Sequence, residues 1–181
     1  MYYTVKYKGP FGYIKPWTAV RDSKTFSQQF LTPSIIEGIR QKLEVGSIVR
    51  HKLRYSSISV QQEQTQPRGW EKKSKTKEMV RTASIIERGV IIDPVLYLAF
   101  DTEEDAIKAS KQHICLCRNE DVLFPDAEIY AMNENEFNSL TGFELHFEEK
   151  DNSFLVGFNR FDNATPMYGW LEITGKPVLG L

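Results

Sequence analysis

The sequence has little of what would carry a protein into a membrane or an oxidising compartment. Its two cysteines are Cys115 and Cys117, and no apolar run approaches the roughly 18 residues of a membrane-spanning helix. The first residues, MYYTVKYKGPFGY, alternate polar with apolar side chains and so lack the apolar core of a signal peptide. A single Cys-x-Cys spacing favours free thiols over a disulfide or a zinc site. We therefore expect a cytoplasmic protein without a membrane partner.

The sequence also lacks the common motifs of nucleotide binding and of metal or serine catalysis. It contains no Walker loop and no G-x-G-x-x-G, H-E-x-x-H or G-x-S-x-G pattern. The histidines, His51, His113 and His146, stand apart from one another in the sequence. We expect core or surface roles for His113 and His146, no metal site and no cofactor.

One enzymatic hypothesis stays open in the segment RHKLRY at residues 50–55. A histidine near a lysine and a tyrosine could cleave RNA without metal, because one group can activate the 2′-hydroxyl while another protonates the leaving oxygen. On a strand, however, neighbouring side chains such as His51 and Lys52 point to opposite faces. We therefore favour phosphate contact without cleavage, and keep His51, Lys52 and Tyr55 as weaker candidates for a metal-independent endoribonuclease.

Charge is distributed unevenly along the chain, although its net value is −1. Residues 1–88 contain 17 Lys and Arg and 7 Asp and Glu, a balance of +10; residues 89–181 contain 6 and 17, a balance of −11. Such asymmetry indicates that the basic half faces a polyanion, unless the two halves neutralise each other in the fold. The acidic half would then meet a basic partner or repel nucleic acid from other surfaces.

Much of the positive charge lies between residues 40 and 88, where 12 Lys and Arg stand against 5 Glu. Tyr55 and Trp70 are interleaved with them, as is typical of grooves that follow a phosphate backbone and stack bases on aromatic rings. Residues 62–78 are polar and interrupted by Pro67 and Gly69, which predicts a projecting loop or hairpin tip. A solvated loop without a ligand has the same composition and stays an alternative.

A second basic and aromatic segment, residues 9–32, leads to the first predicted helix. Its aromatic content argues against disorder, and loops of this length in compact domains are commonly functional. Backbone N–H groups at the helix start, next to Ser34, form a natural anion site. Together these segments predict RNA contacts from Lys15, Trp17, Arg21, Lys24, Ser34, Arg50, Lys52, Arg54, Arg68, Trp70, Lys72, Lys73, Lys75, Lys77 and Arg81.

Hydrophobic periodicity predicts an α+β protein whose first part has the order β-α-β-β-α-β. Pro33 suits the first position of a helix with Thr32 as its cap, and acidic residues 103–105 suit the start of the second helix. This order is the ferredoxin-like, or RRM-like, arrangement. The predicted elements are strands at 2–8, 47–61, one or two within 79–100, and 114–117, with helices at 33–43 and 102–112.

The rest of the sequence predicts further strands and one short helix. A hairpin is expected to turn at Asp151 and Asn152, between two of these strands. We expect a ferredoxin-like domain over residues 1–118 and a small β-rich C-terminal extension over 119–181 packed on it. The expected strands of this extension lie near 127–131, 142–148, 153–161 and 167–174, and the short helix lies at 134–140.

Two segments carry a family resemblance. Residues 9–43, GPFGYIKPWTAVRDSKTFSQQFLTPSIIEGIRQKL, pass through an aromatic-Pro stretch to a P-S-x-x-x-G-Ile element that opens the first helix at Pro33. Residues 116–121, LCRNED, precede Phe124 and Pro125 after the second helix. Both segments resemble the CRISPR-associated RAMP proteins that cap the five-prime handle of a guide RNA, the Cas five-like family.

The resemblance implies a subunit of a multisubunit CRISPR effector ribonucleoprotein of prokaryotic antiviral or anti-plasmid defence. Some relatives are metal-independent endoribonucleases, but their cluster of tyrosine, lysine and histidine does not match this sequence cleanly, so we favour binding without catalysis. Its partners would be the guide RNA (crRNA), backbone RAMP subunits, a large subunit and, indirectly, target DNA. A hairpin thumb would fall at about residues 56–82 and touch the neighbouring backbone subunit. The family's glycine-rich loop is reduced to Gly175 and Gly180, so a type I and a type IV complex both stay open. A ferredoxin-like protein-interaction module that binds no RNA is the third hypothesis.

Overall fold

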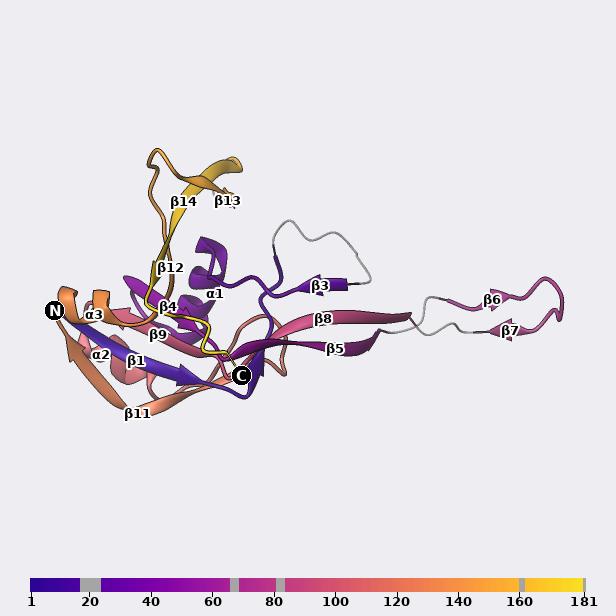
Figure 1. Ribbon diagram of the computed structural model, residues 1–181, viewed down its shortest axis with the longest axis horizontal. Helices are drawn as coiled ribbons and strands as arrows, with labels where there is room; N and C mark the ends of the chain where they lie inside the picture. The colour runs from indigo at the N-terminus through magenta and orange to yellow at the C-terminus, as the bar shows by residue number, and fades with distance from the viewer. Residues whose placement is uncertain (17–23, 66–68, 81–83, 160–161, 181) are drawn as a thin grey trace.

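The computed structural model describes residues 1–16, 24–65, 69–80, 84–159 and 162–180. It contains three helices and fourteen strands among these residues (Figure 1). The helices are α1 (Pro33–Leu43), α2 (Glu103–Ala109) and α3 (Glu134–Ser139). The strands are β1 (Tyr2–Lys8), β2 (Phe11–Gly12), β3 (Lys24–Phe26), β4 (Arg50–Arg54), β5 (Ser57–Thr65), β6 (Glu71–Lys72), β7 (Met79–Val80), β8 (Ser84–Ile92), β9 (Val95–Phe100), β10 (Ile114–Cys115), β11 (Val122–Met132), β12 (Gly142–His146), β13 (Phe154–Asn159) and β14 (Thr165–Thr174).

The body of the protein is an eight-stranded sheet with the order β10-β11-β1-β9-β4-β12-β14-β13. β9 lies between β1 and β4 and is antiparallel to both, so β1 and β4 run in the same direction. β1 lies in the same way between β9 and β11. The connection from β1 to β4 contains α1, and the connection from β9 to β11 contains α2. This α+β sheet is consistent in general with an RRM-like fold.

The two faces of the sheet are covered by different helices. On one face, alternate residues of β1 and β9, such as Val5 and Leu98, form the main core with Ile39 of α1 and Ala106 of α2. On the other face, Phe137 of α3 packs in a smaller cluster of apolar residues. Among the described residues, no helix is long and apolar enough to cross a membrane.

Several predicted boundaries need correction. The strand expected at 47–61 is interrupted near Tyr55: β4 joins the large sheet, whereas β5 pairs with β8 in a second sheet. A matching break separates β8 from β9 at Asp93, whose φ of 48° marks a turn, and Pro94. The second helix ends at Ala109, three residues before its predicted end. The hairpin predicted at Asp151 and Asn152 is wrong, because β14 lies between β12 and β13 and pairs with both.

The strands on both sides of residue 118 share the large sheet. β11 pairs with β1 along most of its length, and β12 pairs with β4 where Phe143 lies opposite Leu53. The domain boundary near residue 118 stays a prediction, but the segment that follows it supplies four of the eight strands. One of them, β14, pairs with β12 through Trp170 to Thr174 and with β13 through Thr165 to Gly169. Figure 1 shows β13 and half of β14 projecting from the body as an arm.

A long hairpin projects from another side of the body (Figure 1). Its shaft is formed by β5 and β8, which pair without interruption from Ser57 opposite Ile92 to Thr65 opposite Ser84. The other edge of β8 carries β2 and β3. At its tip, β6 and β7 form a short antiparallel pair. We use the name thumb for residues 57–92; it therefore ends ten residues beyond the predicted range of 56–82, because the return strand β8 runs to Ile92.

Candidate nucleic-acid interface

The tip of the thumb holds a group of exposed lysines. Residues 73–78 form a tight turn in which the Lys73 amide donates to the Glu78 carbonyl oxygen at 2.9 Å, and Lys77 takes a φ of 56°. Trp70 is 63% exposed beside this turn. The tip extends away from the body (Figure 1). The exposed lysines of the tip are Lys72, Lys73, Lys75 and Lys77.

The predicted anion site at the start of α1 is only partly assembled from its expected residues. Ser34 and Lys15 are exposed, and the Ser34 hydroxyl lies 3.1 Å from the Thr32 hydroxyl. Lys24, however, belongs to β3 on the edge of the thumb, where its ammonium lies 3.3 Å from the Glu87 carboxylate. The structure therefore places Lys24 with the thumb. Of the other predicted contact residues, Trp17, Arg21, Arg68 and Arg81 lie outside the described residues.

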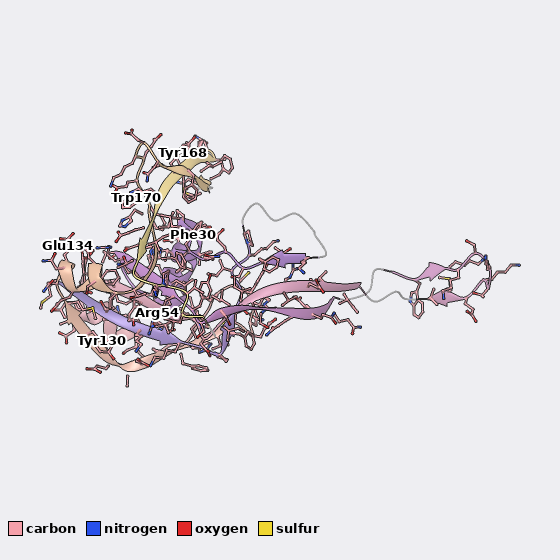
Figure 2. The ribbon with its side chains drawn as sticks, in the orientation of Figure 1. Phe30, Arg54, Tyr130, Glu134, Tyr168 and Trp170 are labelled. Atoms are coloured by element: carbon pink, nitrogen blue, oxygen red, sulfur yellow. The ribbon has the colours of Figure 1, made fainter. Side chains whose placement is uncertain are left out.

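The basic residues of β4 are directed to internal partners. Arg50 donates to both carboxylate oxygens of Glu144, which is 2% exposed. Lys52 is fully buried, and its ammonium donates to the Asn138 and Leu140 carbonyl oxygens. Burial lowers the pKa of Lys52, and Glu172 opposes that effect. Arg50 and Lys52 thus hold α3 and β12 on the sheet. We therefore leave both residues out of the proposed RNA surface. Arg54 is half-buried at the end of β4 (Figure 2).

The three candidates for RNA cleavage do not share a surface. His51 and Tyr55 are buried with Leu53, whereas Lys52 points to the opposite face of β4. The ring of His51 stacks against Phe147 with 5.5 Å between centroids. Burial lowers the pKa of His51 to about 3, so the ring is neutral near pH 7. This geometry gives no support to a catalytic group formed by these three residues.

Sequence reasoning missed a polar network across β4, β12 and β14. His146 Nε2 lies 2.8 Å from the Glu172 carboxylate, and the His146 ring stacks on Trp170 at 4.2 Å between centroids. Glu144, His146 and Glu172 place one potential metal-ligating atom each within 4.8 Å of one another, the only such trio among the described residues. The carboxylate of Glu144 already pairs with Arg50, which would compete with a dication. These positions are strand neighbours only after β14 has paired with β12, so no local sequence pattern indicates them.

The LCRNED segment forms a turn against the shaft of the thumb. Arg118 forms a two-pronged ion pair with the buried Asp121 and lies over the ring of Tyr13, with 5.4 Å between its guanidinium carbon and the ring centroid. Arg88 of β8 lies over the same ring at 5.5 Å. Glu63 of β5 is within 3.6 Å of both arginines. These contacts link the LCRNED turn and Tyr13 to both strands of the thumb.

Comparison with known proteins shows a likeness in fold. No family model and no curated protein matches the sequence. A solved chain titled "CRISPR RNA-guided surveillance complex" superposes on it with a TM-score of 0.54 and 14% identity, over 100% of this chain and 93% of that chain. At this identity the likeness shows a shared fold along almost the whole of both chains.

Proposed function

We propose that this protein is a guide-RNA-binding subunit of a CRISPR effector ribonucleoprotein, and that it binds RNA without cleaving it. The observation that supports the proposal most is the full-length fold likeness to a chain of an RNA-guided surveillance complex. The strand order β11-β1-β9-β4, with helices in both crossovers, fits a ferredoxin-like RAMP domain. The thumb with its exposed lysines supplies a surface that suits a phosphate backbone.

The finer assignment is a cap on the five-prime handle of the guide RNA. In this proposal the exposed Ser34 and Lys15, together with the N-terminus of α1, face the handle, and the thumb tip lies over the RNA where the next subunit begins. Trp70 offers an aromatic ring of the kind on which bases stack. Backbone RAMP subunits and a large subunit would complete the complex in the cytoplasm, and target DNA would be reached through the guide.

The first test measures binding of a single-stranded RNA of defined five-prime sequence against salt concentration. Four tip lysines and up to two further contacts would give a slope of log K against log salt of about −3 to −4, since each neutralised phosphate on a single strand contributes about −0.7. Lys72→Glu with Lys73→Glu should reduce the steepness of that slope by at least about 1.4. A slope near zero in the unmodified protein would refute electrostatic RNA binding.

A matched control keeps the change of charge and moves it away from the thumb. Lys111 and Lys176 are exposed and lie outside the thumb, so Lys111→Glu with Lys176→Glu alters net charge equally. The control should retain the slope of the unmodified protein. The two alternative functions predict different results. Cleavage of a repeat hairpin in EDTA would indicate an endoribonuclease. Absence of RNA from every purified complex would indicate a protein-interaction module.

A further inference from the structure

β4 and β5 follow each other in the chain, and their outer edges form one continuous edge. Only the first part of that edge, along β4 and Tyr55, is paired with another segment. β12 pairs with β4 at Leu53. Beyond it, Tyr55 bridges Val178 in a parallel arrangement, and its amide donates to the Pro177 carbonyl oxygen at 3.0 Å. From Ser57 to Thr65, β8 is the only strand partner of β5 among the described residues. Strand pairing by the protein's own chain therefore reaches the base of the thumb, and among the described residues the outer edge of the following nine has no strand partner.

The open edge lacks the features that usually protect an edge strand. Native proteins shorten such strands, interrupt them with a bulge or proline, or place charges on them, because unpaired backbone groups are a template for another strand. β5 has nine residues, SISVQQEQT, in unbroken register with β8. Its single charge, Glu63, is paired with Arg88 and Arg118. The opposite edge of the shaft differs, because β2 and β3 cover much of β8 there.

One face of the shaft is apolar next to the open edge. Ile58 and Val60 are 36% and 47% exposed and point to the same face, two residues apart on β5. Val60 lies opposite Gly89 of β8, and Phe26 of β3 lies opposite the same glycine from the other side. A Cβ atom at Gly89 would approach the Phe26 ring to 2.2 Å, so the absent side chain lets Phe26 extend the apolar stripe across β8. The other face of β5 presents serine, glutamine and the paired carboxylate of Glu63.

We propose that the outer edge of β5 binds an extended segment of a partner protein by strand addition. Backbone hydrogen bonds would supply much of the affinity, and alternate side chains would supply the specificity. The incoming segment would place apolar residues beside Ile58 and Val60 and uncharged polar residues on the opposite face. Paired with β5, the segment continues the line of neighbours that β12 and residues 177–180 begin.

A different protein fits this edge better than a second copy or a nucleic acid. Self-pairing of two β5 strands over all nine residues, centred on Gln61, sets Ile58 opposite Gln64 and Val60 opposite Gln62. The apolar stripe would then face glutamine. Nucleic acid lacks the alternating N–H and C=O groups of an extended peptide, and the lysines of the thumb lie at its tip. A protein contact at this edge does not depend on whether the tip binds RNA.

The test compares hydrogen exchange of β5 in two preparations of the full chain. One is the isolated recombinant protein; the other is the tagged protein purified from its native host with its associated proteins and treated with nuclease. Amides of β5 that point away from β8 should exchange at least tenfold more slowly in the second preparation. Cross-links from a photoreactive amino acid placed at the exposed Gln62 to one protein should accompany the protection. RNA content, measured before nuclease treatment, reports separately on the proposed function.

Two double variants make the test specific. Ile58→Lys with Val60→Lys places charges beside the open edge and should abolish both the protection and the cross-links. Ile107→Lys with Ile173→Lys exchanges two apolar residues that are 39% and 58% exposed on α2 and β14, outside the thumb, and should preserve both. All four positions are exposed, so the far-UV circular dichroism of both variants should match that of the unmodified protein.

Three results would overturn the proposal. Equal exchange of β5 in the two preparations would show that no partner covers the edge. Protection of β5 in the host preparation before nuclease treatment, lost after that treatment, would identify RNA as the occupant. Protection of β5 in the isolated chain, with a dimer mass by light scattering, would identify a second copy. Each result is independent of the salt-dependence experiment, which can succeed or fail without changing it.

Discussion

Lowering the pH should destabilise this protein because of the buried His51. Replacing His51 should remove that part of the pH dependence. The side chain is 4% exposed, its ring stacks on Phe147, and its Nε2 atom has no hydrogen-bond partner among the described residues. Burial, with smaller contributions from the charges of His146 and Arg50, lowers the pKa of His51 to about 3. In the unfolded chain the same ring takes up a proton near pH 6.5.

The sign and size of the effect follow from that difference. Above pH 6.5 the ring is neutral in both states and contributes no pH dependence. As the pH falls from 6.5 towards 3, only the unfolded chain gains a proton at this position, so the free energy of unfolding falls by about 1.4 kcal/mol for each pH unit. Between pH 7.5 and pH 5.0 His51 alone should therefore remove about 2 kcal/mol of stability.

Urea unfolding of the unmodified protein and of His51→Phe, at pH 7.5, 6.5, 5.5 and 5.0, measures this effect. The substitution keeps a ring against Phe147 and removes the titrating group, while every other ionisable group is shared by the two proteins. The stability difference between them should change by about 2 kcal/mol in favour of His51→Phe over this range. Parallel stability curves would mean that His51 takes up its proton in the folded protein, and would refute its burial.

Three further predictions concern packing and capping. Gly89→Ala should cost about 1–3 kcal/mol of stability by displacing the Phe26 ring, and Phe26→Ala should relieve most of that cost in the double variant; thermal unfolding of the three variants measures it. Arg50→Met should cost about 3–5 kcal/mol because it leaves the buried Glu144 unpaired, whereas Arg50→Met with Glu144→Leu should be nearly neutral in a double-mutant cycle; equal losses in both proteins would contradict this. Asn133→Ala should cost about 1 kcal/mol by removing the capping box of α3, with a selective loss of amide protection in residues 134–139.

The local elements could be predicted because their signals lie within short stretches of sequence. The bounds of α1 agree with the prediction, since an apolar stripe from Ile36 to Leu43 follows a proline at its start. The succession of strands and helices along the first part of the chain also follows from the alternation of polar and apolar residues. The break between β4 and β5 could not be predicted in this way, because alternation continues through Tyr55 while the strand changes its neighbour from β9 to β8. The change is set by pairing with a distant segment.

The sequence predicted correctly that the tip lysines are exposed but not that Arg50 and Lys52 are directed to internal partners, and RNA contact at the tip stays a prediction. A run of lysines around Trp70 indicates a solvated tip, because burying so many cations without partners is strongly unfavourable. Arg50 and Lys52 look equally available in the sequence. Their partners, Glu144 and the carbonyl groups at the end of α3, lie some ninety residues further along the chain, and only the completed sheet brings them together. A basic residue on a strand therefore predicts surface charge poorly.

The parallel contact between Tyr55 and Val178 also bears on how the protein is made. Residues 177–180 reach the outer side of Tyr55 and Ser56 only after nearly all of the sheet and both projecting elements have been synthesised. Until then a nascent chain carries an open edge that runs from the body into the thumb, during the time in which unpaired strands are most prone to wrong association. Slowing translation between residues 60 and 177 should lengthen that exposure and increase the fraction of protein lost to aggregation, whereas slowing it before residue 50 should have little effect.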